Sequence, residues 1–441
     1  MRRKEKKQGW MFVILSCLLV LSVFVSGFRV AIASKDLRPQ DIIAFADIYG
    51  VITDRFEQPI YENGKVKNYN IFGNVIGDGS KIHNSLVYRY SDELKPGSVN
   101  FISGYRNVEE KPRIMRTTLL AEESLSEIAK LYGSNKGCCF AYNYETGEVY
   151  AALSFPAYNP VNKDTEFINR CFDSLYIPGS TMKVVTTVLA VEQDIKLDKI
   201  TYECNGEYVL PSGEKIACAY KHGTVDYAGA IGKSCNGYFV KVASEFNMDE
   251  ALETFRDLGF QTNEEKSNKI ETADFRRMMS SVRITNTSSY SNAWAFAGQG
   301  KDEVNPVHMA MIAGAIANDG KAAEPYIVKS IYNQDKDKFI YEADESEMTK
   351  LMSSKTASTV AKLWKTGVDK YYYGENYGLS KKITYAKTGT AQKNDNKAEN
   401  NRLLMGVIEE SKTAFYIVVE SHSDKLPFMV ANKLTEIISR Q

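Results

Sequence analysis

The sequence has no excess of charge of either sign, because its 55 lysines and arginines equal its 55 aspartates and glutamates. A chain without net charge offers no global field that would attract a polyanion, so nucleic acid is not expected as a partner. Charged residues make up 25% and hydrophobic residues 44% of the 441 residues, close to the averages for folded soluble proteins. We therefore expect a globular chain with a sizeable core.

Cysteine is scarce as well, with seven residues, and none of them forms the paired CxxC pattern typical of zinc ligands. The sequence therefore predicts no metal site and no cofactor. Cys204 and Cys218 flank a polar segment centred on residues 211–213, which suits a hairpin closed by a disulfide. Two separate buried thiols fit the same pattern, and the distance between the sulfur atoms decides between these alternatives.

The chain has only four histidines and lacks a G-x-S-x-G segment, the usual setting of the nucleophile in Ser-His-Asp hydrolases. A hydrolase of that type is therefore not expected. A serine nucleophile can also take its base from a lysine, and the motifs below supply one.

Long hydrophobic runs are absent except near the start, where residues 10–28 carry no charge and follow five basic residues. At about 1.5 Å per residue this run spans about 28 Å, close to the thickness of the hydrocarbon layer. We expect a cytoplasmic tail at 1–9, a transmembrane anchor at 10–33 and an extracytoplasmic remainder. A cleaved signal peptide is the alternative, since residues 31–33 have a small-x-small pattern, and it would also export the chain.

Two domains follow the anchor in the predicted organisation. Residues 34–113 are polar with short strand-like runs, which predicts a small β-rich pedestal, whereas helical and strand periods alternate over 114–441. We expect a β-hairpin over 138–153 and a helix beginning at Ser180. Other helices are predicted at 119–131, 306–317 and 428–438, and other strands at 382–392 and 414–419.

Ser180 and Lys183 stand one helical turn apart, directly after Pro178 and Gly179. A serine hydroxyl is a weak nucleophile until a neighbouring base takes its proton, and lysine can act as that base only in its neutral form. Burial and a second nearby cation both favour the neutral form. The spacing alone is weak, because Ser212 and the lysine three residues after it have the same spacing.

A second motif, Ser234 and Asn236 with Cys235 between them, can present a hydroxyl and a carboxamide to one site from a loop or a helix end. Taken alone this pattern is common, because Ser and Asn also bond to their own backbone in turns and helix caps.

The third motif is Lys387, Thr388, Gly389 and Thr390, which lies in a predicted strand. Lys387 and Gly389 share one face of that strand, and a glycine lets a substrate backbone approach closely. Residues 365–367 repeat the Lys-Thr-Gly sequence, but there the glycine is expected to end a helix over 357–364.

The three motifs occur together and in this order, which makes the set far more specific than its parts. It is the set found in penicillin-binding proteins and class A β-lactamases. From the anchor to nearly the last residue, the sequence resembles a class B penicillin-binding protein, a monofunctional peptidoglycan D,D-transpeptidase. Further segments that carry the likeness are 50–55, 147–149, 154–156, 177–180, 222–223, 298–300 and 305–306.

The resemblance implies an α+β fold, with a transpeptidase domain of the penicillin-binding and serine β-lactamase type. That domain has an antiparallel sheet flanked by helices and an all-helical subdomain, and it stands on the small pedestal behind one N-terminal transmembrane helix. The resemblance also implies peptidoglycan stem peptides as substrates and β-lactams as inhibitors. A polytopic glycan polymerase of the FtsW/RodA type is the implied partner, and the bacterial cell membrane is the implied location.

The resemblance further implies that Ser180 attacks the D-Ala-D-Ala carbonyl and forms an acyl-enzyme, which the amine of a second stem peptide resolves. Lys183 would be the base, Ser234 would relay a proton to the leaving amine, and Asn236 would bond the substrate amide. Lys387 would help to keep Lys183 neutral.

The residues implied to bind substrate are Thr388, Gly389 and Thr390, which with Lys387 would hold its carboxylate, and the N–H groups of Ser180 and Thr390 would form the oxyanion hole. Two alternatives stay open at this point. One is a non-catalytic penicillin-binding scaffold or β-lactam sensor. The other is a D,D-carboxypeptidase or β-lactamase that uses the same serine and admits water to the acyl-enzyme.

Overall fold

The computed structural model describes most of the chain. Before Gly50 it describes only residues 19–23 and 25. No helix among the described residues is long and apolar enough to cross a membrane. The tail at 1–9 and most of the anchor at 10–33 lie outside the described residues, so both stay predictions. The described residues are 19–23, 25, 50–77, 84–94, 97–99, 106–108, 111–160, 167–263, 268–285, 289–344, 348–374, 377–391, 400–421 and 423–441.

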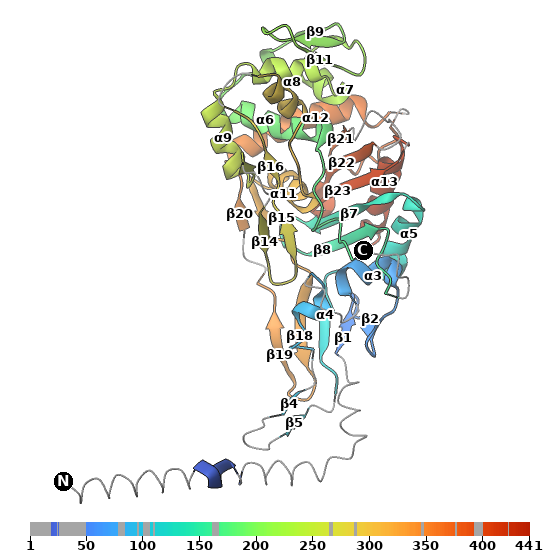
Figure 1. Ribbon diagram of the computed structural model, residues 1–441. Coiled ribbons are helices and arrows are strands. Elements are labelled where there is room, and N and C mark those ends of the chain that lie inside the picture. Colours follow the sequence, from blue (N-terminus) through green and yellow to red (C-terminus); the bar gives the residue numbers. More distant parts are fainter. Residues whose placement is uncertain are drawn as a thin grey trace, which may run out of the picture.

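A five-stranded antiparallel sheet in the order β21-β22-β23-β7-β8 forms the middle of the molecule (Figure 1). The predicted hairpin is confirmed as β7 and β8, and the two C-terminal strands are confirmed within a few residues as β21 and β23. β21 stands at one edge of this sheet, so one side of its backbone has no strand partner, and side chains such as Trp364 and Gln299 donate to its carbonyls there instead. The strands are β7 (Lys136–Asn143), β8 (Val149–Phe155), β21 (Tyr385–Ala391), β22 (Asn401–Ile408) and β23 (Thr413–Glu420).

Helices cover both faces of this sheet, which is why its strands are apolar almost throughout. α11 (Pro306–Ala317) packs on one face, and α5 (Glu122–Tyr132) and α13 (Leu426–Ile438) pack on the other (Figure 1). α11 begins at Pro306, where a missing N–H costs nothing, and the Asn305 side chain accepts a bond from the Val307 N–H. All three helices were predicted, and the fold is α+β as expected.

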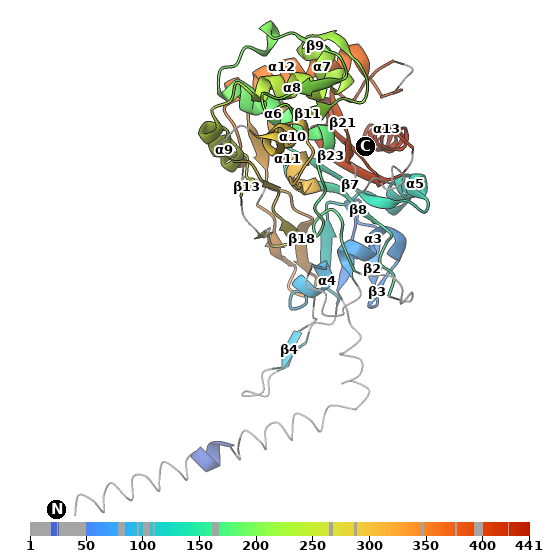
Figure 2. The ribbon, with the colours of Figure 1, turned by 45° about the horizontal axis from the view of Figure 1, so that its top comes forward.

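A group of helices lies at one end of the molecule, at the top of Figure 1 (Figures 1 and 2). Within this group Gly367 corrects a prediction, because it does not end a helix but lies inside one that runs on to Tyr371. A Cβ at Gly367 would lie 2.3 Å from Ile231 Cγ2, so the glycine lets two helices approach closely. The helices are α6 (Met182–Glu192), α7 (Tyr227–Lys233), α8 (Asn236–Ala243), α9 (Met248–Asp257), α10 (Tyr290–Ala297) and α12 (Ser354–Tyr371).

The lower part of the molecule contains a six-stranded sheet in the order β19-β18-β6-β1-β2-β3, in which β1 and β6 are parallel. Its strands come from both sides of the predicted domain boundary at residue 114, so that boundary crosses one continuous sheet. The predicted division into pedestal and transpeptidase domain stays a prediction. The strands are β1 (Val51–Thr53), β2 (Pro59–Glu62), β3 (Lys65–Val66), β6 (Ile114–Thr117), β18 (Val328–Asn333) and β19 (Lys338–Glu342).

Two short helices, α3 (Tyr69–Ile76) and α4 (Leu86–Arg89), accompany this lower sheet. The remaining strands pair as two-stranded ribbons. These ribbons are β4 (Gly97–Val99) with β5 (Arg106–Val108), β9 (Tyr202–Cys204) with β12 (Gly223–Val225), β10 (Glu207–Val209) with β11 (Lys215–Ala217), β13 (Gln261–Thr262) with β16 (Ser281–Val282), β14 (Lys269–Glu271) with β15 (Arg276–Met278), and β17 (Lys321–Ala323) with β20 (Met348–Lys350).

Truncation of a side chain in the central strand should destabilise the whole domain. Ile417 lies in β23 and is fully buried, so Ile417→Ala removes apolar contacts and leaves a cavity. We expect a loss of about 2–5 kcal/mol in the free energy of unfolding, measured by urea denaturation of the full chain. Ile340→Ala in β19 is the control, because Ile340 is 38% exposed. Equal losses in the two variants would contradict this description of the core.

Candidate active site

Ser180 lies on a tight turn that leads into a buried helix. The turn is the 3-10 helix η1 (Gly179–Thr181), and α6 follows it directly, so the predicted helix start is formed by these two elements together. Lys183 lies one turn further on, and its Nζ is 2.5 Å from Ser180 Oγ. The structure thus brings the hydroxyl and the amine of the first motif into direct contact.

The Lys183 ammonium group is fully buried among neutral partners. Its Nζ donates to Asn236 Oδ1 at 2.7 Å and to the Ala297 carbonyl at 3.1 Å. Burial lowers the pKa of Lys183 well below the ordinary lysine value, and repulsion from Lys387 lowers it further. Lys183 is therefore suited to lose its proton and to accept the one on Ser180 Oγ.

Ser234 and Asn236 lie where α7 ends and α8 begins. Ser234 has a left-handed backbone, with φ 62° and ψ 41°, an uncommon conformation for a residue other than glycine. Its Oγ accepts a hydrogen bond from Lys387 Nζ at 3.1 Å, while Asn236 contacts Lys183 and donates its Nδ2–H to the Ala217 carbonyl at 2.7 Å. The second motif therefore connects the two lysines.

Lys387 lies in the edge strand β21 and is as deeply buried as Lys183. Besides Ser234, its Nζ donates to the Thr388 carbonyl at 2.9 Å. Burial lowers the pKa of Lys387 to about 7. Neither lysine has a carboxylate partner among the contacts that the structure describes, so both cations lack the usual compensation for burial.

Three glycines let the Ser180 turn press against the edge strand. A Cβ at Gly179, whose φ is +54°, would lie 2.8 Å from Thr390 N, and one at Gly389 would lie 2.7 Å from the Pro178 carbonyl. A Cβ at Gly298 would lie only 1.7 Å from the Gly179 carbonyl. Because these positions lack side chains, the backbone that carries the Ser180 N–H packs directly against that of Thr390.

The third motif opens onto a cleft of about 900 Å³, which Ser180, Ser234, Asn236, Thr388, Gly389 and Thr390 all line. Thr388 Oγ1 lies 3.1 Å from Tyr372 Oη, which fixes one of the hydroxyls, while Thr390 is exposed. The structure therefore places every predicted site residue in one region, with Lys183 and Lys387 buried behind the cleft wall.

Two cleft residues, Gln299 and Arg402, were not predicted as site residues. Gln299 Nε2 donates to the Thr390 carbonyl at 2.9 Å. Residues 298–300 contributed to the family resemblance, but no role in the site was predicted for them. Arg402 stands opposite Thr390 in the β21–β22 register, and its guanidinium donates to Thr390 Oγ1 at 3.2 Å. Only the strand pairing reveals Arg402, because no local motif marks it.

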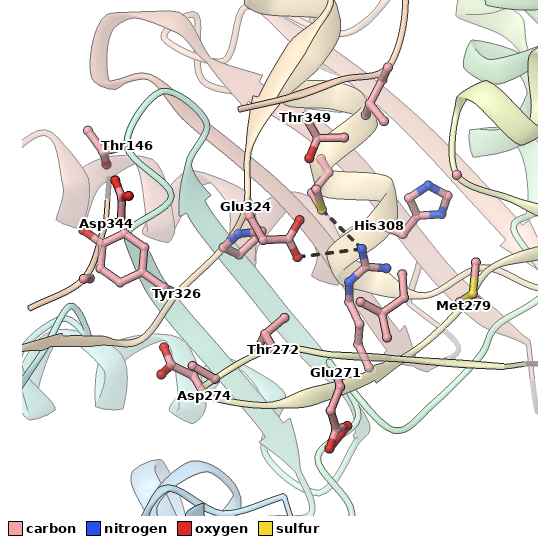
Figure 3. A pocket seen from close by; sticks show the side chains of 18 of the residues that line it. Thr146, Glu271, Thr272, Asp274, Met279, His308, Glu324, Tyr326, Asp344 and Thr349 are labelled. Atoms are coloured by element: carbon pink, nitrogen blue, oxygen red, sulfur yellow. Dashed lines mark hydrogen bonds and ion pairs between the residues drawn. The ribbon is translucent and has the colours of Figure 1, made fainter. Parts of the chain in front are cut away.

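A second cavity, of about 510 Å³, lies away from these motifs and is shown in Figure 3. The Arg277 guanidinium, which also lines the cavity, lies 4.0 Å from the Glu324 carboxylate. Glu324 and His308 are among the lining side chains in Figure 3. Burial lowers the pKa of His308 to about 3, so this imidazole is neutral. The residues described as lining this cavity include no serine, cysteine or lysine, so the cleft at Ser180 is the better candidate.

Relatives with similar sequences include, by name, a sporulation protein, a penicillin-binding protein and a peptidoglycan D,D-transpeptidase. Stage V sporulation protein D of Bacillus subtilis is 23% identical over 327 residues, which cover 70% of this chain and 49% of that protein. Penicillin-binding protein PbpB of Mycolicibacterium smegmatis is 24% identical over 386 residues, covering 78% and 58%. Peptidoglycan D,D-transpeptidase MrdA of Escherichia coli is 22% identical over 326 residues, covering 63% and 48%. The chain spans about half the length of these curated relatives.

Solved structures share the fold over most of the chain. The D,D-transpeptidase domain of a peptidoglycan glycosyltransferase from Eggerthella lenta has a TM-score of 0.74 at 22% identity, covering 89% of this chain and 98% of that one. Penicillin-binding protein A from M. tuberculosis, in an imipenem acyl-enzyme complex, has a TM-score of 0.73 at 19% identity, with the same coverage. At these identities the likeness concerns the fold alone.

The family description "Penicillin binding protein transpeptidase domain" matches residues 137–438, well over half of the chain. All three motifs lie inside that range. The chain therefore belongs to the penicillin-binding protein transpeptidase family, as the motifs and their spacing predicted.

Proposed function

We propose that this protein is a peptidoglycan D,D-transpeptidase that forms an acyl-enzyme on Ser180 and is inhibited by β-lactams. The observation that carries the proposal is the 2.5 Å contact between Ser180 Oγ and the fully buried amine of Lys183. A relative named peptidoglycan D,D-transpeptidase and a structural neighbour captured as an imipenem acyl-enzyme support it.

Acylation starts with neutral Lys183, which removes the proton from Ser180 Oγ as that oxygen attacks the carbonyl carbon of the penultimate D-alanine. The N–H groups of Ser180 and Thr390 stabilise the oxyanion of the tetrahedral intermediate. Ser234 gives its hydroxyl proton to the leaving amine and takes one in turn from Lys387, whose Nζ donates to it at 3.1 Å. The peptide bond breaks, D-alanine leaves, and an ester joins the stem peptide to Ser180.

The second half-reaction reverses these proton movements. The amine of another stem peptide attacks the ester carbonyl and forms the new peptide bond, while the proton that the amine loses returns through Ser234 to Lys387. Ser180 Oγ departs and regains a proton through Lys183. Asn236 acts in both stages by position, because it accepts from Lys183 through its oxygen, donates to the Ala217 carbonyl through its nitrogen and lines the cleft where the substrate amide would lie.

The open edge of β21 suits an extended peptide, which would add to the sheet as a further strand. Its terminal carboxylate would lie near Lys387 and the hydroxyls of Thr388 and Thr390. Arg402 lies near the same hydroxyl of Thr390, although its guanidinium also pairs with the Asp424 carboxylate at 2.9 Å, so its positive charge is shared between the two. A planar guanidinium is well matched to a carboxylate. Gly389 leaves room for the substrate backbone.

The proposal places the catalytic domain outside the cell, anchored in the bacterial cell membrane by a single N-terminal helix. The uncharged run at 10–28 and the basic residues before it support this location. A polytopic glycan polymerase of the FtsW/RodA type is the proposed partner. A scaffold or sensor without turnover is the weaker alternative, because the catalytic side chains are all present and in contact.

Exposure to a fluorescent penicillin should add one adduct per chain, detected by intact-mass analysis of the full-length protein in detergent. Ser180→Ala should abolish the adduct, because the nucleophilic oxygen is removed. Ser212→Ala is the control and should leave the adduct unchanged. Ser212 is exposed and, like Ser180, stands three residues before a lysine. A folded wild type that forms no adduct would favour the scaffold alternative.

The rate of acylation by penicillin should rise with pH as Lys183 loses its proton. Below pH about 7 Lys387 is charged and lowers the pKa of Lys183, so Lys387→Gln removes this repulsion. The rising limb of the pH–rate profile should therefore move to higher pH in Lys387→Gln. Lys365→Gln changes the exposed lysine of the repeated Lys-Thr-Gly sequence and should leave the pH–rate profile unchanged. A limb that stays in place in Lys387→Gln would count against coupling of the two lysines.

A further inference from the structure

Three cysteines and one histidine from separate segments converge beside the active site. Cys204 ends β9, Cys218 follows β11, His222 precedes β12, and Cys235 lies between α7 and α8. The Sγ atoms of Cys204 and Cys218 are 3.6 Å apart, and those of Cys218 and Cys235 are 3.9 Å apart. His222 Nδ1 is 3.2 Å from Cys204 Sγ, and all four atoms lie within 4.8 Å of one another.

These distances are too long for a disulfide, in which the sulfur atoms are about 2.0 Å apart. All three cysteines are free thiols, so the disulfide considered for Cys204 and Cys218 is not formed. Cys204, His222 and Cys235 are buried, and Cys218 lies in the wall of the active-site cleft. The cluster is therefore largely shielded from solvent while it touches the site.

We propose that Cys204, Cys218, His222 and Cys235 bind one zinc ion. Zinc–sulfur bonds of about 2.3 Å and zinc–nitrogen bonds of about 2.0 Å, arranged tetrahedrally, separate two sulfur ligands by about 3.8 Å and sulfur from nitrogen by about 3.5 Å. The 3.6 and 3.9 Å sulfur separations straddle the first value, and the 3.2 Å separation is close to the second. The remaining pairs lie within 4.8 Å, so zinc would bind after the ligand atoms move together by up to about 1 Å.

The ligand set points to zinc in a structural role. Three thiolates and one imidazole form a tetrahedral set that suits zinc, and with four protein ligands no position stays open for water or substrate. Binding releases the three thiol protons to solvent, and His222 must carry its proton on Nε2. The backbone N–H of Gly237 donates to Cys218 Sγ at 3.4 Å, the kind of contact that stabilises a thiolate ligand.

The site would hold the second catalytic motif in place, an effect that rests on the proposed function. Cys235 stands between Ser234 and Asn236. Cys218 directly follows Ala217, whose carbonyl accepts a hydrogen bond from the Asn236 side chain. Zinc would thus tie the strained Ser234 backbone to the β9 and β11 ribbons. Its ligands act by positioning, because none of them touches the reacting atoms.

The test is the metal content of the full-length protein, purified in detergent without chelators and with an affinity tag that binds no metal. Mass spectrometry of the metals should find about one zinc per chain. Cys204→Ala and His222→Ala should each lose most of it. Cys171→Ala is the matched control, because Cys171 is a buried free thiol that does not belong to the cluster. This variant should keep the full zinc content.

A second measurement does not depend on how the variants fold. Wild type grown with cobalt in place of zinc should show the thiolate charge-transfer and visible bands of a tetrahedral cobalt site. Wild type that binds neither metal and titrates as free thiols would overturn the proposal, as would an intact mass lower by two hydrogens, which indicates a disulfide.

The zinc site and the acylation reaction can fail separately. Ser180→Ala should keep its zinc and form no penicillin adduct. Zinc-free wild type should still form the adduct, but more slowly, because Ser234 and Asn236 are held less firmly. Unchanged acylation after zinc removal would overturn the positioning role, and the metal content would still report on the site itself.

Discussion

Two lysine side chains are buried without carboxylate partners in the part of the chain that the structure describes, and the rest of the site is built around that constraint. Burial of a cation is costly, and Lys183 and Lys387 lie close enough to repel each other. The side chains of Ser180, Ser234 and Asn236 hydrogen-bond to the two amines and satisfy them without neutralising charge. The sheet and its covering helices supply the rigidity that keeps this unfavourable arrangement in place, and the chemistry needs it, because a lysine that is easily deprotonated can serve as a base.

Much of the site could be predicted from the sequence because its three motifs are local. Each places its residues through the period of one helix, one strand or one turn, so Ser180 with Lys183 and Lys387 with Gly389 could be related without a structure. Arg402 could not be found in this way, since it reaches Thr390 only through strand pairing. Gly367 was misread as a helix end, because nothing in the local sequence shows that Ile231 packs against it.

The cysteine cluster shows the same limit more sharply. Its ligands are separated by 13, 3 and 12 residues, which matches no paired CxxC pattern, and only the folding of two small ribbons against α8 brings them together. The strand partners in the lower sheet also could not be predicted from local sequence patterns. Composition predicted short strands before residue 114, but not that they would share a sheet with β18 and β19 from the far side of the boundary.

That shared sheet determines how the molecule would respond to mechanical load. β1 runs parallel to β6 and pairs with it over three residues, and the chain enters β1 from its N-terminal end. Tension on that end, with the body of the protein held, would pull the two strands along their length, so their hydrogen bonds would be loaded in shear and share the force. On its other edge β1 pairs antiparallel with β2, so bonds on both edges hold the strand that would take the load. The attachment at β1 is therefore of the kind that resists extension, whatever holds the end of the chain.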